Sequence, residues 1–166
     1  MSEKVFAYGS NMCSGRFRAY SVSPEGPGKP AFLRGYRLCF NKRSTRDHSG
    51  KANVEPQAGA EVWGVVYEIP EGQLRILDNG EGGYDRREMI VHTARGEAVE
   101  AWVYVARTPD PDSALRPYTW YKHFLVEGAL EHGLPDTYIA DLRAIEAVED
   151  PDRARDQRKR ELACSE

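Results

Sequence analysis

The stretch "AEVWGVVYEIP", residues 60–70, carries apolar side chains at both odd and even positions. A strand with one face in water alternates apolar and polar residues, whereas a strand covered on both faces is a nearly continuous apolar run. The stretch therefore predicts a central strand of a sheet, with a neighbouring strand on each side.

Other segments predict the strands around this one. Four have the apolar pattern of strands: residues 4–10, 31–41, 84–94 and 97–107. The last two are joined at Arg95 and Gly96, which indicates a hairpin. Residues 44–59, "STRDHSGKANVEPQAG", are polar and glycine-rich and predict a long loop or an irregular strand.

Helical spacing follows later in the chain. Residues 71–83 begin with a helical turn or two and break at Asn79 and Gly80. Residues 116–133 place Tyr118, Tyr121, Leu125 and Ala129 on one helical face, and Pro117 and Gly133 mark its ends. A second helix is predicted over residues 136–148. Strands first and helices last favour an α+β fold. We expect one domain over residues 1–147 and a charged tail, helical or disordered, over residues 148–166.

Composition limits the classes of partner. The chain has 166 residues, with 23 Lys and Arg against 26 Asp and Glu, and a net charge of −3. No general electrostatic attraction to nucleic acid or acidic membranes follows from this balance. No apolar run approaches the ~20 residues of a membrane span, and the N-terminus lacks the pattern of a secretory signal. We expect a cytoplasmic protein with small-molecule or protein partners, and neither nucleic acid nor membrane as partner.

The cysteines and histidines show no metal-binding pattern. Cys13, Cys39 and Cys164 are odd in number and unrelated in spacing, which fits neither a disulfide framework nor a zinc site and suits a reducing compartment. We expect buried or incidental thiols. The four histidines are scattered. We expect no metal site and no cofactor.

The four residues Tyr8, Gly9, Ser10 and Asn11 follow the first predicted strand. A glycine lets the chain turn sharply, so successive N–H groups can point at one ligand oxygen, with a hydroxyl and an amide beside them. The same composition also suits an ordinary turn at the end of a strand. Local sequence leaves both interpretations open.

Glu81 stands between Gly80 and Gly82, three residues after Asp78. Its neighbours offer no side chains to shield its carboxylate. Close to aromatic groups such as Tyr84 or Trp63, its pKa would rise and it could act as a base near neutral pH. The alternative is a surface turn with an incidental charge.

Four blocks, in this order along the chain, resemble the γ-glutamylcyclotransferase family. They are "FAYGSN", "EVWGVVYEI", "LDNGEG" and "YKHFLVEGALEHGLPDTYIADLRAIE", which begin at residues 6, 61, 77 and 121. The likeness extends from about residue 4 to about residue 147 and leaves only the charged tail outside.

The resemblance implies a closed, mixed β-barrel with flanking helices, a substrate pocket at the barrel mouth, and a homodimer. It implies that Glu81 is the catalytic residue. The substrate-binding residues that it implies are Val5, Phe6, Ala7, Tyr8, Gly9, Ser10, Asn11, Tyr84 and Tyr121. One departure is visible, because the glycine-rich link from Glu81 to Tyr84 is shorter here than in the animal enzymes.

The implied reaction closes a γ-glutamyl group on itself. The substrate's α-amine attacks its γ-carbonyl, which forms 5-oxoproline and releases an amino acid or an amine. Because the nucleophile belongs to the substrate, no Ser-His-Asp or Cys-His set is needed. Glu81 would take a proton from the α-ammonium and return it to the leaving nitrogen. Backbone N–H donors of the loop would stabilise the γ-oxyanion.

Other functions remain open from sequence. The substrate could be a γ-glutamylamine instead of a γ-glutamyl amino acid. A released amino acid has a carboxylate that calls for a nearby cation, whereas a released amine does not. Candidate cations are Arg16, Arg18, Arg43 and Arg46. A protein that only binds γ-glutamyl ligands, and an amidase with Cys13 as nucleophile, are further alternatives. The aromatic group of Tyr118, Trp120 and Tyr121 could stack on bases, although packing of a helix onto the sheet explains it better.

Overall fold

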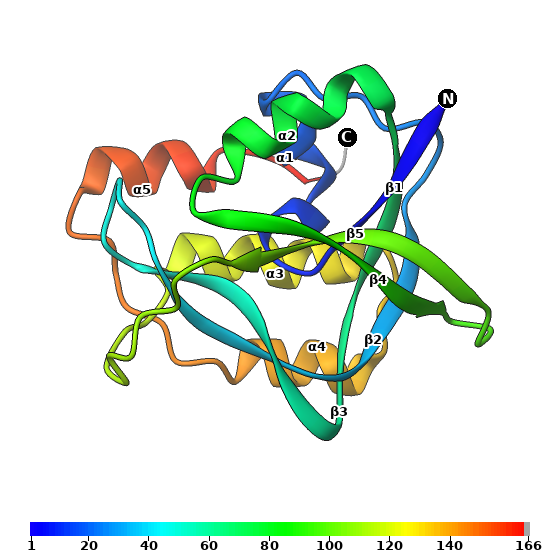
Figure 1. Ribbon diagram of the computed structural model, residues 1–166. Helices are drawn as coiled ribbons and strands as arrows, with labels where there is room; N and C mark the ends of the chain where they lie inside the picture. The colour runs from blue at the N-terminus through cyan, green and yellow to red at the C-terminus, as the bar shows by residue number, and fades with distance from the viewer. Residues whose placement is uncertain (165–166) are drawn as a thin grey trace.

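The computed structural model describes residues 1–164 and contains a closed barrel with the strand order β1-β3-β2-β4-β5 (Figure 1). The strands are β1 (Ser2–Ala7), β2 (Lys29–Arg43), β3 (Gly50–Pro70), β4 (Tyr84–Thr93) and β5 (Ala98–Ala106). A parallel pairing of Val5 with Trp102 closes the barrel between β1 and β5, while the other pairings are antiparallel. The predicted α+β fold with a closed mixed barrel is confirmed.

The long strand β3 lies between β1 and β2, so the predicted central strand is confirmed. Its side chains Val62, Val65 and Ile69 are fully buried. Residues 44–59 were expected to form a long loop or an irregular strand, and from Gly50 onward the strand is observed, because residues 50–59 lengthen β3. They pair with β2 across two register shifts, and these irregularities let a polar, glycine-rich segment continue as a bent strand.

The hairpin of β4 and β5 is confirmed. Its register runs from Tyr84 opposite Ala106 to His92 opposite Ala98. Gly96, in the turn, has a φ of +88°, a left-handed conformation that glycine adopts without steric cost.

Helices cover the ends and sides of the barrel (Figure 1). They are α1 (Ser14–Ala19), α2 (Leu74–Gly80), α3 (Thr119–Glu131), α4 (Asp136–Arg143) and α5 (Arg153–Arg160), with short 3-10 turns η1 (Ser10–Met12) and η2 (Glu71–Gln73). The stop at Gly133 is confirmed by its φ of +66° just after α3. α4 ends at Arg143, short of the predicted 148. Within residues 1–164, no helix combines the length and the apolar character that a membrane crossing requires.

Helix α3 lies directly against the chain that follows β1. A side chain on Gly128 would place its Cβ 2.6 Å from the backbone of both Met12 and Cys13, a distance that real contacts do not reach. Only glycine allows α3 and η1 to approach so closely. The close approach holds the loop before η1 in place.

The charged C-terminal segment forms helix α5, which contacts α3 (Figure 1). Asp150, which is buried, accepts hydrogen bonds from Trp120 Nε1 at 2.9 Å and from two guanidinium nitrogens of Arg155 at 2.6 Å each. Arg160 donates to Thr119 Oγ1 at 2.7 Å. The segment has few apolar residues, but hydrogen bonds of Asp150 with Trp120 and of Arg160 with Thr119 attach it to α3.

The expectation of three free thiols was wrong. Cys13 and Cys164 form a disulfide bond, and only Cys39 is free among the described residues. The two bonded residues are 151 positions apart, so their spacing carries no local signal. Because one disulfide can use two of three cysteines, an odd count does not exclude it. The cysteine argument for a reducing compartment therefore fails.

Candidate active site

A pocket opens where β1 ends, and the structure brings all ten predicted site residues together around it. The lining residues are Val5, Phe6, Ala7, Tyr8, Gly9, Ser10, Asn11, Ala52, Glu81, Tyr84, Tyr104 and Tyr121. Sequence reasoning missed Ala52 and Tyr104. Ala52 contributes through its backbone, and Tyr104 lies inside an ordinary strand pattern, so neither carries a local signal.

The loop after β1 forms one wall of this pocket. It enters η1, in which the amide of Met12 donates to the carbonyl of Gly9 at 3.1 Å. The first N–H groups of such a turn have no acceptor inside it, which leaves the amides of Ser10 and Asn11 free of intrahelical bonds. A Cβ on Gly9 would lie 3.1 Å from Ala52 Cβ and 3.2 Å from Tyr121 Oη. The glycine therefore keeps the space next to these two residues open.

Glu81 lines the pocket from the end of α2, next to the loop. Its amide donates to the carbonyl of Leu77 at 2.9 Å, and Gly83, with a φ of +86°, then turns the chain into β4. Asn11 Nδ2 donates to Glu81 Oε1 at 2.7 Å. The bond joins the two segments that sequence singled out separately.

The surroundings of Glu81 tune its acidity. Burial of the carboxyl group raises its pKa to about 7, although Arg16, Lys42 and the hydrogen bond from Asn11 act in the opposite direction. The residue as a whole keeps some exposed surface, while the carboxyl group itself is enclosed. A carboxyl group with this pKa can both accept and donate a proton near neutral pH.

Asp78 attaches helix α2 to the barrel. Its carboxylate accepts a hydrogen bond from Tyr104 Oη at 2.7 Å and forms an ion pair with Arg86 Nε at 3.0 Å. The backbone carbonyl of Tyr104 accepts a hydrogen bond from the buried hydroxyl of Tyr8. One connected set of polar groups thus spans from the loop through β5 to the turn before Glu81.

The backbone of Ala52 orients two further pocket residues. Tyr84 Oη donates to the Ala52 carbonyl at 2.7 Å, and the Ala52 amide donates to Tyr121 Oη at 3.0 Å. Burial raises the pKa of Tyr121 to about 12 and the pKa of Tyr84 well above its usual value. Both phenols are therefore neutral at pH 7 and can serve as hydrogen-bonding groups.

A second cavity, here called the outer chamber, adjoins the pocket. The two share Ser10, Asn11, Glu81, Tyr84 and Tyr121. Five cationic side chains also line the outer chamber: Arg16, Lys42, Arg46, Lys51 and Lys159.

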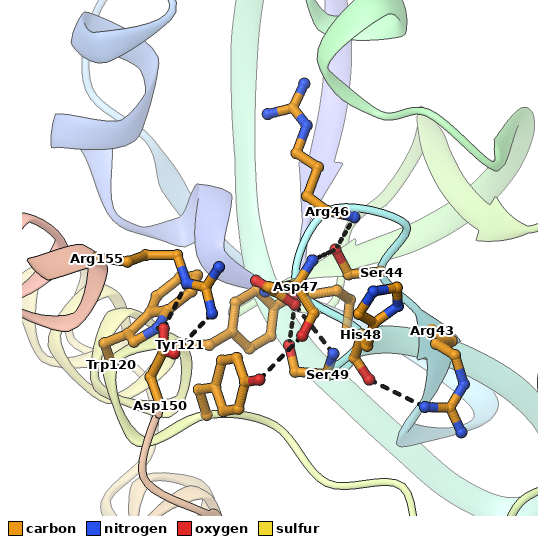
Figure 2. Close-up of polar contacts among 12 residues, drawn as sticks. Arg43, Ser44, Arg46, Asp47, His48, Ser49, Trp120, Tyr121, Asp150 and Arg155 are labelled. Carbon is orange, nitrogen blue, oxygen red and sulfur yellow. Dashed lines mark hydrogen bonds and ion pairs between the residues drawn. The ribbon is translucent and has the colours of Figure 1, made fainter. Parts of the chain in front are cut away.

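Two of the four candidate cations lie at the outer chamber, namely Arg16 and Arg46. Figure 2 shows the Arg46 side chain extending away from the hydrogen-bonded cluster around Asp47. The other two candidates are occupied elsewhere. Arg43 pairs with Asp110 at 2.7 Å and with Asp112 at 3.1 Å, and Arg18 lies 3.4 Å from the carbonyl oxygen of Cys164.

Three sequence-based ideas do not match the structure. Trp63 does not line the pocket and donates instead to Glu61 at 3.0 Å. Cys13 is fully buried in its disulfide, which removes the thiolate that a cysteine amidase needs. Trp120 and Tyr121 are buried, as helix packing requires, and offer no exposed stacking surface. Among residues 1–164, no group of His, Cys, Asp and Glu is arranged to hold a metal ion.

The AIG2-like family model matches residues 61–142, which include part of β3, all of β4 and β5, and Glu81. The γ-glutamylcyclotransferases of Mus musculus and Homo sapiens are 33% and 32% identical to the chain, over 87% and 85% of its length and 79% and 77% of theirs. A solved γ-glutamyl cyclotransferase aligns with a TM-score of 0.79 and 29% identity, over 95% of this chain and 99% of that chain. The chain belongs to the γ-glutamylcyclotransferase family.

Proposed function

We propose that the protein is a γ-glutamylcyclotransferase. The substrate's α-amine attacks its own γ-carbonyl carbon, the bond to the leaving nitrogen breaks, and the products are 5-oxoproline and a free amine or amino acid. Family membership supports the reaction class, and the chemistry of the pocket supports the individual steps.

Glu81 is the acid and base of this proposal. The α-amino group of a γ-glutamyl amide stands beside a free carboxylate, which holds its pKa above the value of about 7.7–8.0 of a peptide terminus, so it arrives as an ammonium and must lose a proton before it can attack. The Glu81 carboxylate accepts that proton and then returns it to the leaving nitrogen, since an unprotonated amide anion leaves very poorly. The observation that carries the proposal is the enclosed carboxyl group, with a pKa near 7, at the junction of the pocket and the outer chamber.

The loop after β1 holds the γ-glutamyl group in the proposal. Negative charge builds on the γ-carbonyl oxygen as the ring closes, and fixed backbone donors stabilise such charge by about 3–4 kcal/mol each. The amides of Ser10 and Asn11 are the donors we assign, because the start of η1 leaves them without intrahelical acceptors. Tyr84 and Tyr121 complete the wall and keep the chain folded for attack.

The test is release of 5-oxoproline from γ-glutamyl amides by the wild type and by Glu81→Gln. The variant keeps an oxygen that can accept from Asn11 but lacks the base. We expect turnover to fall at least ~100-fold while equilibrium binding of a γ-glutamyl compound stays within about threefold. Near-normal turnover in Glu81→Gln would reject the assignment.

We also propose that the protein is cytoplasmic and that it forms a homodimer. A cytoplasmic location would be checked by cell fractionation with a disulfide assay for Cys13 and Cys164. A homodimer would be checked by light scattering of the purified protein, and a monomeric mass would exclude it.

A further inference from the structure

The outer chamber has an excess of positive charge. Five cations line it, and its carboxyl groups are Asp47 and the shared Glu81. One Asp47 oxygen accepts from Ser49 at 2.6 Å and the other contacts Lys51 Nζ at 3.0 Å. Asp47 therefore has little capacity left for the other cations.

Three of these cations lie against aromatic rings instead of carboxylates. The Arg16 guanidinium lies 5.0 Å from the Phe124 ring centre, and Lys159 Nζ lies 5.0 Å from that of Trp120. Lys42 Nζ lies 5.4 Å from the Tyr84 ring centre. Among residues 1–164, neither these three nor Arg46 has a carboxylate within ion-pair distance.

The cations are also crowded. Burial lowers the pKa of Lys159 to about 8, and repulsion from Arg16 acts in the same direction. Burial likewise lowers the pKa of Lys51 to about 8, with Asp47 opposing the shift and Arg16 and Lys159 adding to it. An anion bound among these groups would offset their mutual repulsion.

Lys159 comes from the C-terminal segment, which is held firmly at this place. Arg155 and Trp120 converge on Asp150 at one end of the segment (Figure 2). At the other end, the carbonyl oxygen of Cys164 accepts from Ser14 Oγ at 2.7 Å, beside the disulfide to Cys13. Helix α5 therefore positions Lys159 at the chamber rather than presenting it to solvent by chance.

We propose that the outer chamber binds the leaving group of the substrate, and that this leaving group carries at least two negative charges, as a dicarboxylic amino acid or a phosphorylated amine does. The inference rests on the proposed function, because the glutamyl part occupies the inner pocket and Glu81 stands where the two spaces meet. A single carboxylate would leave most of the five cations unneutralised. Lys159 is the specificity-determining residue that the C-terminal helix supplies.

The test compares four γ-glutamyl amides that differ in the charge of the leaving amine: propylamine with none, alanine with one, and aspartate and phosphoethanolamine with two. We expect kcat/KM for 5-oxoproline release to rise by about tenfold for each added negative charge. We also expect 0.5 M KCl to reduce the spread, since salt screens the attraction. A preference for only one of the two dianions would tell a carboxylate site from a phosphate site.

Lys159→Gln tests whether Lys159 itself contacts the anionic leaving group or whether the positive potential of the whole chamber attracts it. We expect it to lower kcat/KM about tenfold for the dianionic amides, mainly through KM, and to leave the neutral amide within about twofold. Arg158→Gln, an exposed position next to it on α5, is the matched control and should behave as the wild type. The rate on the neutral amide also reports whether the variant is folded.

The outcomes are distinct. Equal kcat/KM for the neutral and dianionic amides in the wild type would overturn the inference and leave the proposed function standing. An equal loss on all four amides in Lys159→Gln would overturn the role of Lys159. If none of the four amides releases 5-oxoproline, the proposed function fails, and the inference fails with it.

Discussion

Asn11 and Glu81 are joined by a hydrogen bond of 2.7 Å, although 70 positions separate them in the chain. Asn11 belongs to the loop after β1, and Glu81 ends helix α2. The loop that we propose as the substrate cradle is therefore in direct contact with the carboxyl group that we propose as the acid and base. A change at Asn11 should therefore alter the protonation of Glu81.

Replacing Asn11 tests this contact. The amide of Asn11 favours the charged form of Glu81, so Asn11→Ala should raise the pKa of Glu81 above its value of about 7. We expect the acid limb of the kcat/KM profile to move to higher pH, and kcat/KM at pH 7 to fall by about tenfold. A pH–rate profile measures both effects. An acid limb at the wild-type position would show that the bond does not control the proton.

The wild-type enzyme should have a bell-shaped pH dependence. The Glu81 carboxylate forms as the pH rises through about 7. At higher pH the substrate ammonium is lost, and with it the proton that Glu81 passes to the leaving nitrogen. We expect kcat/KM to rise across pH 6 to 8 and to decline above that range. A profile whose acid limb lies near the ordinary glutamate pKa of 4.5 would contradict the environment described for Glu81.

The same carboxyl group should cost stability at alkaline pH. The pKa of Glu81 is raised in the folded state, so between 4.5 and about 7 the folded protein binds more protons than the unfolded chain. Its contribution therefore favours folding most at low pH and is lost as the pH rises through about 7. We expect Glu81→Gln to have a higher Tm than the wild type at pH 8, with the difference shrinking toward pH 5. Thermal unfolding at several pH values checks this, and a constant difference would speak against it.

Asp78 should act as a positioning residue. It accepts from Tyr104 and pairs with Arg86, and these contacts hold α2 and thereby Glu81. We expect Asp78→Ala to cost about 1 kcal/mol of stability, since the group is partly exposed. The variant should lower kcat more than it changes KM, because the Glu81 carboxyl group is no longer held in a fixed position.

Arg75→Ala is the control for this prediction. Arg75 lies exposed on the same helix and has no ion pair among the described residues. Arg75→Ala should leave both kcat and KM unchanged. If Asp78→Ala changes stability but leaves kcat intact, the residue has a structural role alone.

The disulfide between Cys13 and Cys164 should stabilise the fold. It joins the segment after the loop to the end of the chain. We expect Cys164→Ser to lower the free energy of unfolding by about 2–4 kcal/mol. A reductant should lower the Tm of the wild type to about that of Cys164→Ser, and it should leave the Tm of the variant unchanged. Cys39→Ser, at the free thiol, should keep the response to reductant. A wild-type Tm that does not respond to reductant would contradict the prediction.

Several elements were predictable because their signals are local. The apolar run at residues 60–70 predicted a central strand covered on both faces. β3 lies between β1 and β2, and the successive residues Val65, Val66 and Tyr67, which point to alternate faces, are all buried. The strand pair around Gly96 followed from alternation and a turn glycine. For the segment at residues 50–59, polar composition left a loop and an irregular strand both open. Only the pairing with β2, a contact between separate segments, makes it a strand.

For the site, local chemistry marked the Tyr8 loop and Glu81 as candidates, but it allowed an ordinary turn at both places. The resemblance to a known family was needed to choose between the two interpretations. The pKa of Glu81, the role of Ala52 and the arrival of Lys159 at the outer chamber depend instead on folding. These properties arise from burial and from contacts between residues far apart in the chain, such as Asn11 with Glu81, 70 positions apart, and Cys13 with Cys164, 151 positions apart. Local patterns carry no record of such contacts, because the free energy that creates them comes from packing the whole chain.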